Sequence, residues 1–407
     1  MEGHRALRAR RVRRRVVGPL RGRRAHRPRR PPLEVPVSIA LDQVEPELAR
    51  LWAEHRARDA HPRTLDLVAF CATPDELPRV RAALAPLASK RPCRTLTVVC
   101  YPAEAPSITA RVALHVDTAR RSEPVGDDVS LDVRGTARSW VPSAVRQLRR
   151  GDLPMHLWWA GDLPDDDRLF DQLTEDADVT IVHSADMDLR DLEQLRRVQA
   201  WRSEASVFLD LNWVRLALWQ ELVARFFDDE AVAAVIPTLD TVSLGFAPRP
   251  GSSDPAPTQA ALLAGWITVC TGWSAEDATW STEADGARVA TARRADGSPA
   301  RVRFLEDDRP GVYPGALHTV ALSGVGVKLE VARAIEDPRV LCWSGEVAGA
   351  CVPSQCIRVG APEEPRMLAR ALDRPARDPL FERSLAAAAA LTRAVAPLRG
   401  EEATAEK

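Results

Sequence analysis

Short runs of apolar residues alternate with helix-length segments through most of the chain. In the middle these runs are Met155–Ala160, Val179–Val182 and Val207–Leu211. Buried strands of this length that alternate with helices are typical of βαβ units and a mainly parallel sheet. Nine of the eleven tryptophans lie between Trp140 and Trp280. The same part of the chain is therefore expected to hold the bulkiest side chains of the core.

The segment after the third run has the period of an amphipathic helix. Asp210 or Asn212 can cap its first turn. Its bulky apolar side chains share one face: Trp213, Leu216, Trp219, Val223, Phe226 and Phe227. Gln220 lies inside this apolar arc and Arg215 lies on its edge, so both side chains need polar partners from elsewhere in the fold.

The chain before this region predicts the start of the same sheet. Thr64–Ala72 and Arg94–Tyr101 have the composition of buried strands, and Asp75–Ser89 between them has that of a helix. Such a short βαβ unit implies a right-handed crossover. Further strands are expected at Ile108–Val116 and Val129–Val133.

The pattern changes in the last third of the chain. After a helix that starts at Thr258, short alternating segments are separated by turn signals such as Asp285–Gly286. This pattern predicts an antiparallel meander that continues to about Arg358. Two helices should follow, near Glu363–Leu372 and Pro379–Val395.

The predicted fold class is therefore α/β. Residues 34–275 should form a mainly parallel, Rossmann-like sheet domain, and residues 276–407 a smaller α+β domain with an antiparallel meander. Residues 1–33 form an arginine-rich tail with too few apolar residues to fold. No GxGxxG or GxxxxGK[ST] loop follows any predicted strand, so no dinucleotide or nucleotide cofactor is expected.

The charge of the chain is uneven. Its net charge is −1, but residues 1–30 hold thirteen arginines and one glutamate, so the remainder is acidic. The tail could bind nucleic acid. The favoured alternatives are a solvated tail and an upstream extension of the reading frame. No aromatic residues are interleaved with the arginines, and this argues against nucleic acid.

The seven cysteines include no CxxC pair, so neither a disulfide framework nor a zinc site is expected, and we interpret them as reduced thiols. Cys71 and Cys100 lie near corresponding ends of successive strands, and Cys351 and Cys356 are close in sequence. Either pair could be redox-active if its thiols were accessible and of low pKa. No apolar run approaches the roughly 20 residues of a membrane span, so a cytoplasmic protein without a membrane partner is expected.

Two histidines are candidates for acid–base or metal chemistry. His156 lies within an apolar run, which favours a hydrogen-bonded structural role. His183 follows a strand, where functional groups of parallel sheets commonly gather. The acidic residues nearby in sequence are Asp152, Asp186 and Asp188. No third group stands at a diagnostic spacing, so we assign no catalytic residue and no metal.

Five segments resemble motifs of one bacterial family. They are RPCR (Arg91–Arg94), DLPMHLWW (Asp152–Trp159), DLNWVRLALWQELV (Asp210–Val223), LLAGW (Leu262–Trp266) and RDPLFERSL (Arg377–Leu385). They are similar to HPSR, DLPVxxWW, DLAWxRLTxWRxLL, LAGWL and the terminal helix of the glucose-6-phosphate dehydrogenase assembly protein family, OpcA. Cys93, His183 and Gln220 depart from that pattern.

The resemblance implies a non-enzymatic assembly factor. Such a protein binds glucose-6-phosphate dehydrogenase, favours its active oligomer and acts as an allosteric activator in the oxidative pentose phosphate pathway. Glucose 6-phosphate and NADP would be ligands of the partner, and this chain would hold no cofactor. The residues assigned to partner binding are Trp158, Trp159, Asp210, Trp213, Arg215 and Trp219.

Two other functions remain open on the residues alone. One is an α/β enzyme that acts on a phosphorylated sugar, with His183 and the nearby aspartates as acid–base groups. The other is a nucleic-acid-binding protein that works through its basic tail.

Overall fold

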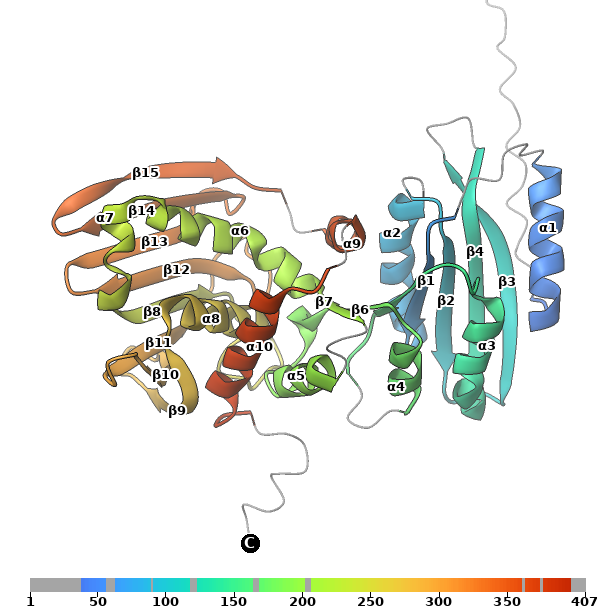
Figure 1. Ribbon diagram of the computed structural model, residues 1–407, viewed down its shortest axis with the longest axis horizontal. Helices are drawn as coiled ribbons and strands as arrows, with labels where there is room; N and C mark the ends of the chain where they lie inside the picture. Colours follow the sequence, from blue (N-terminus) through green and yellow to red (C-terminus); the bar gives the residue numbers. More distant parts are fainter. Residues whose placement is uncertain are drawn as a thin grey trace, which may run out of the picture. The chain divides into compact units, whose positions relative to one another are not determined.

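The computed structural model describes residues 38–55, 63–88, 91–117, 123–163, 168–201, 206–360, 363–373 and 376–396 (Figure 1). The arginine-rich tail predicted over residues 1–33 lies outside the described residues. Residues 36–407 belong to one compact unit.

The first sheet has seven strands in the order β3-β4-β2-β1-β5-β6-β7. Their bounds are β1 Asp66–Cys71, β2 Arg94–Tyr101, β3 Ser107–Asp117, β4 Glu123–Arg134, β5 Met155–Trp159, β6 Val179–Val182 and β7 Val207–Asp210. Only the edge strand β3 is antiparallel to its neighbour. The other six have the 3-2-1-4-5-6 order of dinucleotide-binding folds. The predicted mainly parallel, Rossmann-like sheet is confirmed.

The second sheet has eight strands in the order β15-β14-β13-β12-β8-β11-β10-β9. Their bounds are β8 Leu239–Phe246, β9 Ser274–Thr282, β10 Arg288–Arg293, β11 Pro299–Glu306, β12 Leu317–Gly324, β13 Val327–Arg333, β14 Val340–Val347 and β15 Ala350–Arg358. All neighbours are antiparallel except β8 and β11. The predicted meander is therefore present, as two runs of consecutive strands.

Strand β8 joins these two runs, because it pairs with β11 on one side and β12 on the other. The sequence analysis identified no strand at residues 239–246. The position of β8 means that the second sheet draws on residues before 275 as well as after it. The predicted division of the chain near residue 275 stays a prediction.

Ten α-helices are found among the described residues. They are α1 Val44–Glu54, α2 Leu77–Ala88, α3 Val141–Leu148, α4 Arg168–Glu175, α5 Asp191–Trp201, α6 Leu211–Arg225, α7 Glu230–Ala233, α8 Thr258–Thr271, α9 Glu364–Asp373 and α10 Pro379–Thr392. The short 3-10 helices are η1 Leu41–Gln43, η2 Pro74–Glu76, η3 Gly135–Trp140, η4 Ser184–Asp186, η5 Phe226–Asp228 and η6 Ile236–Thr238.

Each side of the first sheet packs against a different hydrophobic core. On β1, Val68 and Phe70 belong to the core that α1, α3, α4 and α5 cover, whereas Leu67 and Ala69 belong to the core under α2 and α9. Because successive side chains on a strand point to opposite faces, a strand buried on both faces is apolar throughout. This explains why β1 appears in the sequence as an uninterrupted apolar run.

A buried arginine anchors the amino-terminal edge of the first sheet. The Arg94 side chain is 1% exposed, and its Nε donates to Asp127 Oδ2 at 2.9 Å. Its Nη1 also donates to Glu45 in α1 and to the Leu148 carbonyl at the end of α3. The last arginine of RPCR therefore ties α1, α3 and β4 together.

No helix along the described ranges is both long and apolar enough to cross a membrane. The cytoplasmic location stays a prediction.

Helices α8 and α10 touch at Gly265, in the LLAGW segment. A Cβ at this position would lie 2.7 Å from Ala388 N and closer still to the Ser384 carbonyl oxygen. Glycine is required here because the α10 backbone occupies the space of a side chain.

We expect Gly265→Ala to lower the free energy of unfolding by about 2–3 kcal/mol, because overpacking outweighs the roughly 1 kcal/mol by which alanine is the better helix former. Gly151→Ala is the control, since nothing lies within 4 Å of a Cβ built there. Denaturant unfolding of both variants measures the difference. A Gly265→Ala protein as stable as the control would contradict the close contact.

Candidate functional site

The carboxyl ends of the parallel strands form the edge at which ligands of this fold bind. The strand order reverses between β1 and β5, which pair directly. A dinucleotide places its pyrophosphate at the first turn of the helix that follows the first strand. Here the turn between β1 and α2 has the sequence ATPDE, residues 72–76, and contains no glycine.

The Glu76 side chain fills this turn. Its Oε2 accepts a hydrogen bond from the Ala72 N–H at 2.9 Å, and its Oε1 would lie 2.7 Å from a Cβ built on Gly161. Burial raises the pKa of the Glu76 carboxyl, and the hydrogen bond from Ala72 opposes that shift. An acidic side chain here takes the backbone donor that a phosphate would use, and when ionised it repels the phosphate.

A buried polar network lies at the ends of β6 and β7. Asp210 accepts from the Ser184 N–H at 3.0 Å, the Ser184 hydroxyl at 2.6 Å and the Asn212 N–H at 2.9 Å. It therefore caps α6, as the sequence predicted. The Thr258 hydroxyl, at the first residue of α8, donates to the Ser184 carbonyl at 2.6 Å. Burial raises the pKa of Asp210, against the effect of these hydrogen bonds.

Next to this network, His183 joins groups from three helices. Arg215 Nη2 lies 3.1 Å from His183 Nε2, and Glu364 Oε1 lies 3.1 Å from His183 Nδ1. Because a guanidinium only donates, Nε2 accepts and Nδ1 carries the ring proton. Glu364 also pairs with Arg79 at 2.6 Å, and Arg215 lies 5.5 Å from the centroid of the Tyr313 ring. Both ring nitrogens of His183 are therefore engaged.

Helix α9 closes the face of the first sheet beside α2. Its residues Met367 and Leu368 are buried in the same cluster as Trp158. The helix is held at both ends, by Glu364 at its start and by Arg91, which donates to the Leu372 carbonyl near its end. The first arginine of RPCR thus fastens a segment from far along the chain.

The tryptophan pair of β5 is buried on opposite faces of the sheet. Trp158 is 0% exposed in one core, and Trp159 is 1% exposed in the other, where it stacks on Phe70 at 4.1 Å. Both side chains are therefore parts of the core. A partner protein cannot contact these two side chains directly; it can contact only the residues that cover them. Their partner-binding role stays a prediction.

The other residues assigned to partner binding are also engaged within the chain. Asp210 is fully enclosed in its network, and Trp219 is 3% exposed under the Arg333 guanidinium. Trp213 is half-buried, donates from Nε1 to Asp378 at 3.0 Å and packs on Phe381. Arg215 is half-buried beside His183. The structure brings Asp210 and Arg215 to one edge. Trp158, Trp159 and Trp219 lie in the core, and Trp213 packs against it.

Cysteine pairing differs from what the sequence spacing suggested. Cys342 on β14 lies directly opposite Cys356 on β15, and the two form a disulfide. This corrects the interpretation of all seven cysteines as reduced thiols, because strand register decides which residues meet. Cys71 and Cys100 are buried and belong to no disulfide, and burial raises the pKa of Cys71 to about 12. Cys351 is free and exposed. A redox role of these cysteines stays a prediction.

His156 lies in β5 and is 4% exposed. Burial lowers the pKa of its imidazole to about 4, although Asp178 opposes the shift. Its Nδ1 has no hydrogen-bond partner among the described residues. This arrangement is that of a neutral side chain within the core.

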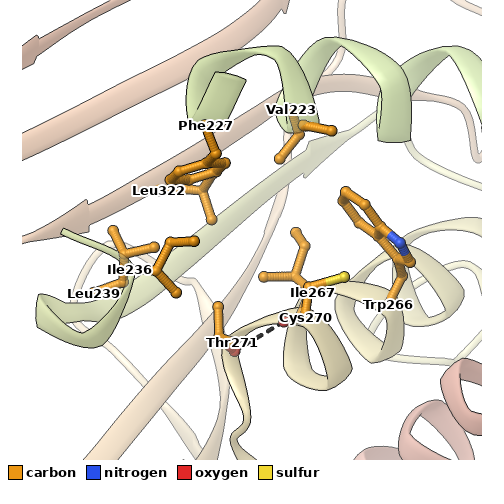
Figure 2. Close-up of a pocket in the computed structure, with 10 residues that line it drawn as sticks. Val223, Phe227, Ile236, Leu239, Trp266, Ile267, Cys270, Thr271 and Leu322 are labelled. Atoms are coloured by element: carbon orange, nitrogen blue, oxygen red, sulfur yellow. Dashed lines mark hydrogen bonds between the residues drawn. The ribbon is translucent and has the colours of Figure 1, made fainter. Parts of the chain in front are cut away.

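An apolar pocket of about 140 Å³ opens on the helical side of the second sheet (Figure 2). Its walls come from α6, η5, η6, β8, α8 and β12: Val223, Phe227, Ile236, Leu239, Ile267 and Leu322. The lining is completed by one more residue of α6, Ala224, and three of α8, Trp266, Cys270 and Thr271. The Thr271 hydroxyl donates to the Ile267 carbonyl at 2.8 Å, so it is already satisfied by its own helix.

Within the described ranges, no three His, Cys, Asp or Glu side chains are grouped so that they could hold a metal ion. Glu76, Arg79 and Glu364 are not among the residues predicted from the sequence, and Thr258 was predicted only as the start of a helix. One signal for Glu76 was available in the sequence. It lies in the turn after a strand, where a dinucleotide-binding protein has a glycine-rich loop. The partners of Glu364 are too distant in sequence to be recognised.

These features define a Rossmann-like α/β protein that holds one of its own carboxylates at the turn where a dinucleotide binds its pyrophosphate. Two family models match the chain, and both describe a glucose-6-phosphate dehydrogenase subunit. The model of its N-terminal domain matches residues 85–200, and the model of its C-terminal domain matches residues 206–385. Together these models cover more than half of the chain. It belongs to the OpcA family of glucose-6-phosphate dehydrogenase assembly proteins.

Curated relatives carry the name OxPP cycle protein OpcA. The one from Synechococcus elongatus is 25% identical over 317 residues, which are 75% of this chain and 69% of the relative. The one from Nostoc punctiforme is 28% identical over 191 residues, which are 46% of this chain and 39% of the relative. In that second match the chain spans well under half of its relative's length.

Solved structures with similar topology include oxidoreductases. The 3-ketoreductase KijD10 from Actinomadura kijaniata, in complex with TDP-benzene and NADP, aligns with a TM-score of 0.47 and 13% identity over 82% of this chain and 97% of its own. The transcriptional regulator Gal80p from Kluyveromyces lactis aligns with a TM-score of 0.45 and 10% identity over 84% and 93%. No argument about chemistry follows from alignments at this level.

Two substitutions of Asp210 distinguish its role in the buried network from its role as the cap of α6. We expect Asp210→Ala to lower the free energy of unfolding by about 3–5 kcal/mol, because it strands buried donors on Ser184 and Asn212. Asp210→Asn keeps an acceptor for both N–H groups and should cost about 1–2 kcal/mol. Equal and small losses in thermal unfolding would show that the network is dispensable.

The buried imidazole should make the fold sensitive to acid. The folded pKa of His156, about 4, lies below its ordinary value of 6.5, so the unfolded chain binds more protons between these pH values. Stability from this residue is therefore present above pH 6.5 and is lost as the pH falls toward 4, by at most about 3 kcal/mol. Urea unfolding of wild type and His156→Gln across this window measures it. Parallel stability curves for the two proteins would contradict the assignment.

Proposed function

We propose that this protein is a non-enzymatic assembly factor and activator of glucose-6-phosphate dehydrogenase. Both halves of the chain match models that are described as domains of a subunit of that enzyme. The relatives named after the OxPP cycle support a place in the oxidative pentose phosphate pathway.

The observation that carries the non-enzymatic part is the Glu76 side chain. It takes the backbone donor at the turn where the dinucleotides of Rossmann-type enzymes bind their pyrophosphate. Along the same edge, Arg79 and His183 both contact the carboxylate of Glu364. The groups that could bind a cofactor are thus committed to internal contacts.

The rival function, an enzyme acting on a phosphorylated sugar, would use His183 as its acid–base group. His183 is 9% exposed, and its two ring nitrogens face Arg215 and Glu364. A general base needs a ring nitrogen within reach of the substrate proton. The assembly role therefore fits the geometry better.

Activation follows from linkage. A partner that binds the active oligomer more tightly than the inactive form shifts the population toward the active oligomer. The shift cannot exceed the difference between the two binding free energies. Tenfold activation therefore needs about 1.4 kcal/mol of that difference. Reciprocity requires glucose 6-phosphate to tighten the protein–protein complex by the same factor.

The test is a pair of titrations with the cognate dehydrogenase. We expect the protein alone to turn over no sugar phosphate and to give no calorimetric binding signal with NADP. Added to the dehydrogenase, it should raise the apparent affinity for glucose 6-phosphate. Affinity between the two proteins should rise by the same factor when glucose 6-phosphate is present and NADP is absent.

Two outcomes would overturn this account in different ways. Turnover or NADP binding by the isolated protein would restore the enzymatic rival. If substrate affinity rises while the two proteins bind each other equally well with and without substrate, then the population-shift mechanism is wrong.

A further inference from the structure

The aromatic residues assigned to partner binding are largely buried, so direct contact with the dehydrogenase calls for another surface. We propose that the apolar pocket between α6 and α8 receives one bulky apolar side chain of the dehydrogenase, from a segment that carries basic residues beside that side chain. This inference rests on the proposed function and names the part of the surface that performs it.

The size of the pocket suits a single side chain. A cavity of about 150 Å³ lined by aliphatic and aromatic residues accepts one benzene-sized ring, and this pocket measures about 140 Å³. It is too small for a drug-sized or cofactor-sized ligand, which needs at least about 300 Å³. One leucine or phenylalanine side chain fits the available volume.

The lining selects an apolar occupant. Val223, Phe227 and Ile267 present hydrocarbon surface toward the space that Figure 2 shows. The Thr271 hydroxyl is bonded to its own helix, so it has no need of a ligand. A polar group placed in the pocket would lose its hydration without gaining a partner, whereas an apolar ring gains by leaving water.

The surface beside the pocket is acidic. The chain leaves the pocket wall at Phe227 and returns to it at Ile236. Between these two residues it exposes Asp228, Asp229 and Glu230 in succession. None of the three forms an ion pair with a residue that the structure describes. Basic side chains that flank the inserted residue would complement this segment and speed association.

Pocket geometry also supplies an internal probe. Cys270 lines the pocket, and it is a free, exposed thiol. Cys351, on β15, is the other exposed free cysteine among the described residues, whereas Cys71, Cys93 and Cys100 are buried. Alkylation with iodoacetamide, mapped by mass spectrometry, can therefore report on the pocket separately from β15.

The experiment measures binding of the full chain to its dehydrogenase by biolayer interferometry. Wild type is measured first, and its failure to bind would refute the proposed function itself. Ala224→Trp then fills the pocket from an exposed lining position of α6. Ala82→Trp is the matched control, because Ala82 is an exposed alanine on α2, outside the pocket lining.

We expect Ala224→Trp to weaken binding at least about 30-fold, as the loss of a central anchor does. The control should stay within about twofold of wild type. In the complex, Cys270 should be protected from alkylation while Cys351 still reacts. Near-wild-type affinity of Ala224→Trp, or full Cys270 reactivity in the complex, overturns the proposal. The alkylation of Cys270 is measured on the wild-type protein. It therefore tests whether the partner covers the pocket even if Ala224→Trp fails to fold.

The role of the acidic segment in association is tested with a triple variant, Asp228→Asn, Asp229→Asn and Glu230→Gln. Asparagine at position 229 keeps a side-chain cap on α7. Association should slow several-fold at low salt, and the difference should vanish at high salt. An unchanged association rate at low salt would refute the proposed basic residues beside the inserted side chain.

Toluene serves as a probe for a free apolar ligand of the pocket. If Ala224→Trp abolishes binding of toluene yet leaves the dehydrogenase complex intact, the pocket serves a free apolar molecule and the proposal is wrong.

Discussion

One buried carboxylate joins the end of the first sheet to the two helices that cover the second sheet. Asp210 ends the last parallel strand, caps α6 and holds the backbone and hydroxyl of Ser184 at the end of the neighbouring strand. Thr258, the first residue of α8, reaches the same Ser184. Since α6 and α8 cover the second sheet, the first sheet sets where both helices begin. Because a buried donor without a partner is costly, each of these hydrogen bonds favours this arrangement of the junction.

The same edge shows a dinucleotide-binding architecture whose first turn holds a carboxylate of the chain itself. Glu76 sits at the first turn, Glu364 approaches the end of β6, and α9 packs beside α2. Each contact is internal, and those of Glu364 and α9 link segments that are distant in sequence. These ion pairs and hydrogen bonds connect the carboxyl ends of the strands to α2 and α9.

Local signals made much of the fold predictable from the sequence. The bounds of β2 and β6 were predicted from apolar runs, and the Asp210 cap from its place before an amphipathic segment. Strand β8 was not predicted because polar Thr241 and Ser243 interrupt its apolar residues. Its partner strands also lie far along the chain. The disulfide was missed for a related reason, since register, not spacing, brings Cys342 to Cys356. The contacts of Glu76 and Glu364 depend on tertiary packing that no local pattern reveals.

The central position of β8 has a consequence for how the protein is made. The ribosome releases β8 before either of its neighbours, and its first neighbour, β11, follows only after α8, β9 and β10. Until then both edges of β8 lack partners, and its apolar side chains Val242 and Leu244 have no sheet to join. Late, long-range pairing of this kind slows folding and exposes strand edges to other chains. The nascent protein should therefore depend on chaperones most between the synthesis of β8 and that of β12.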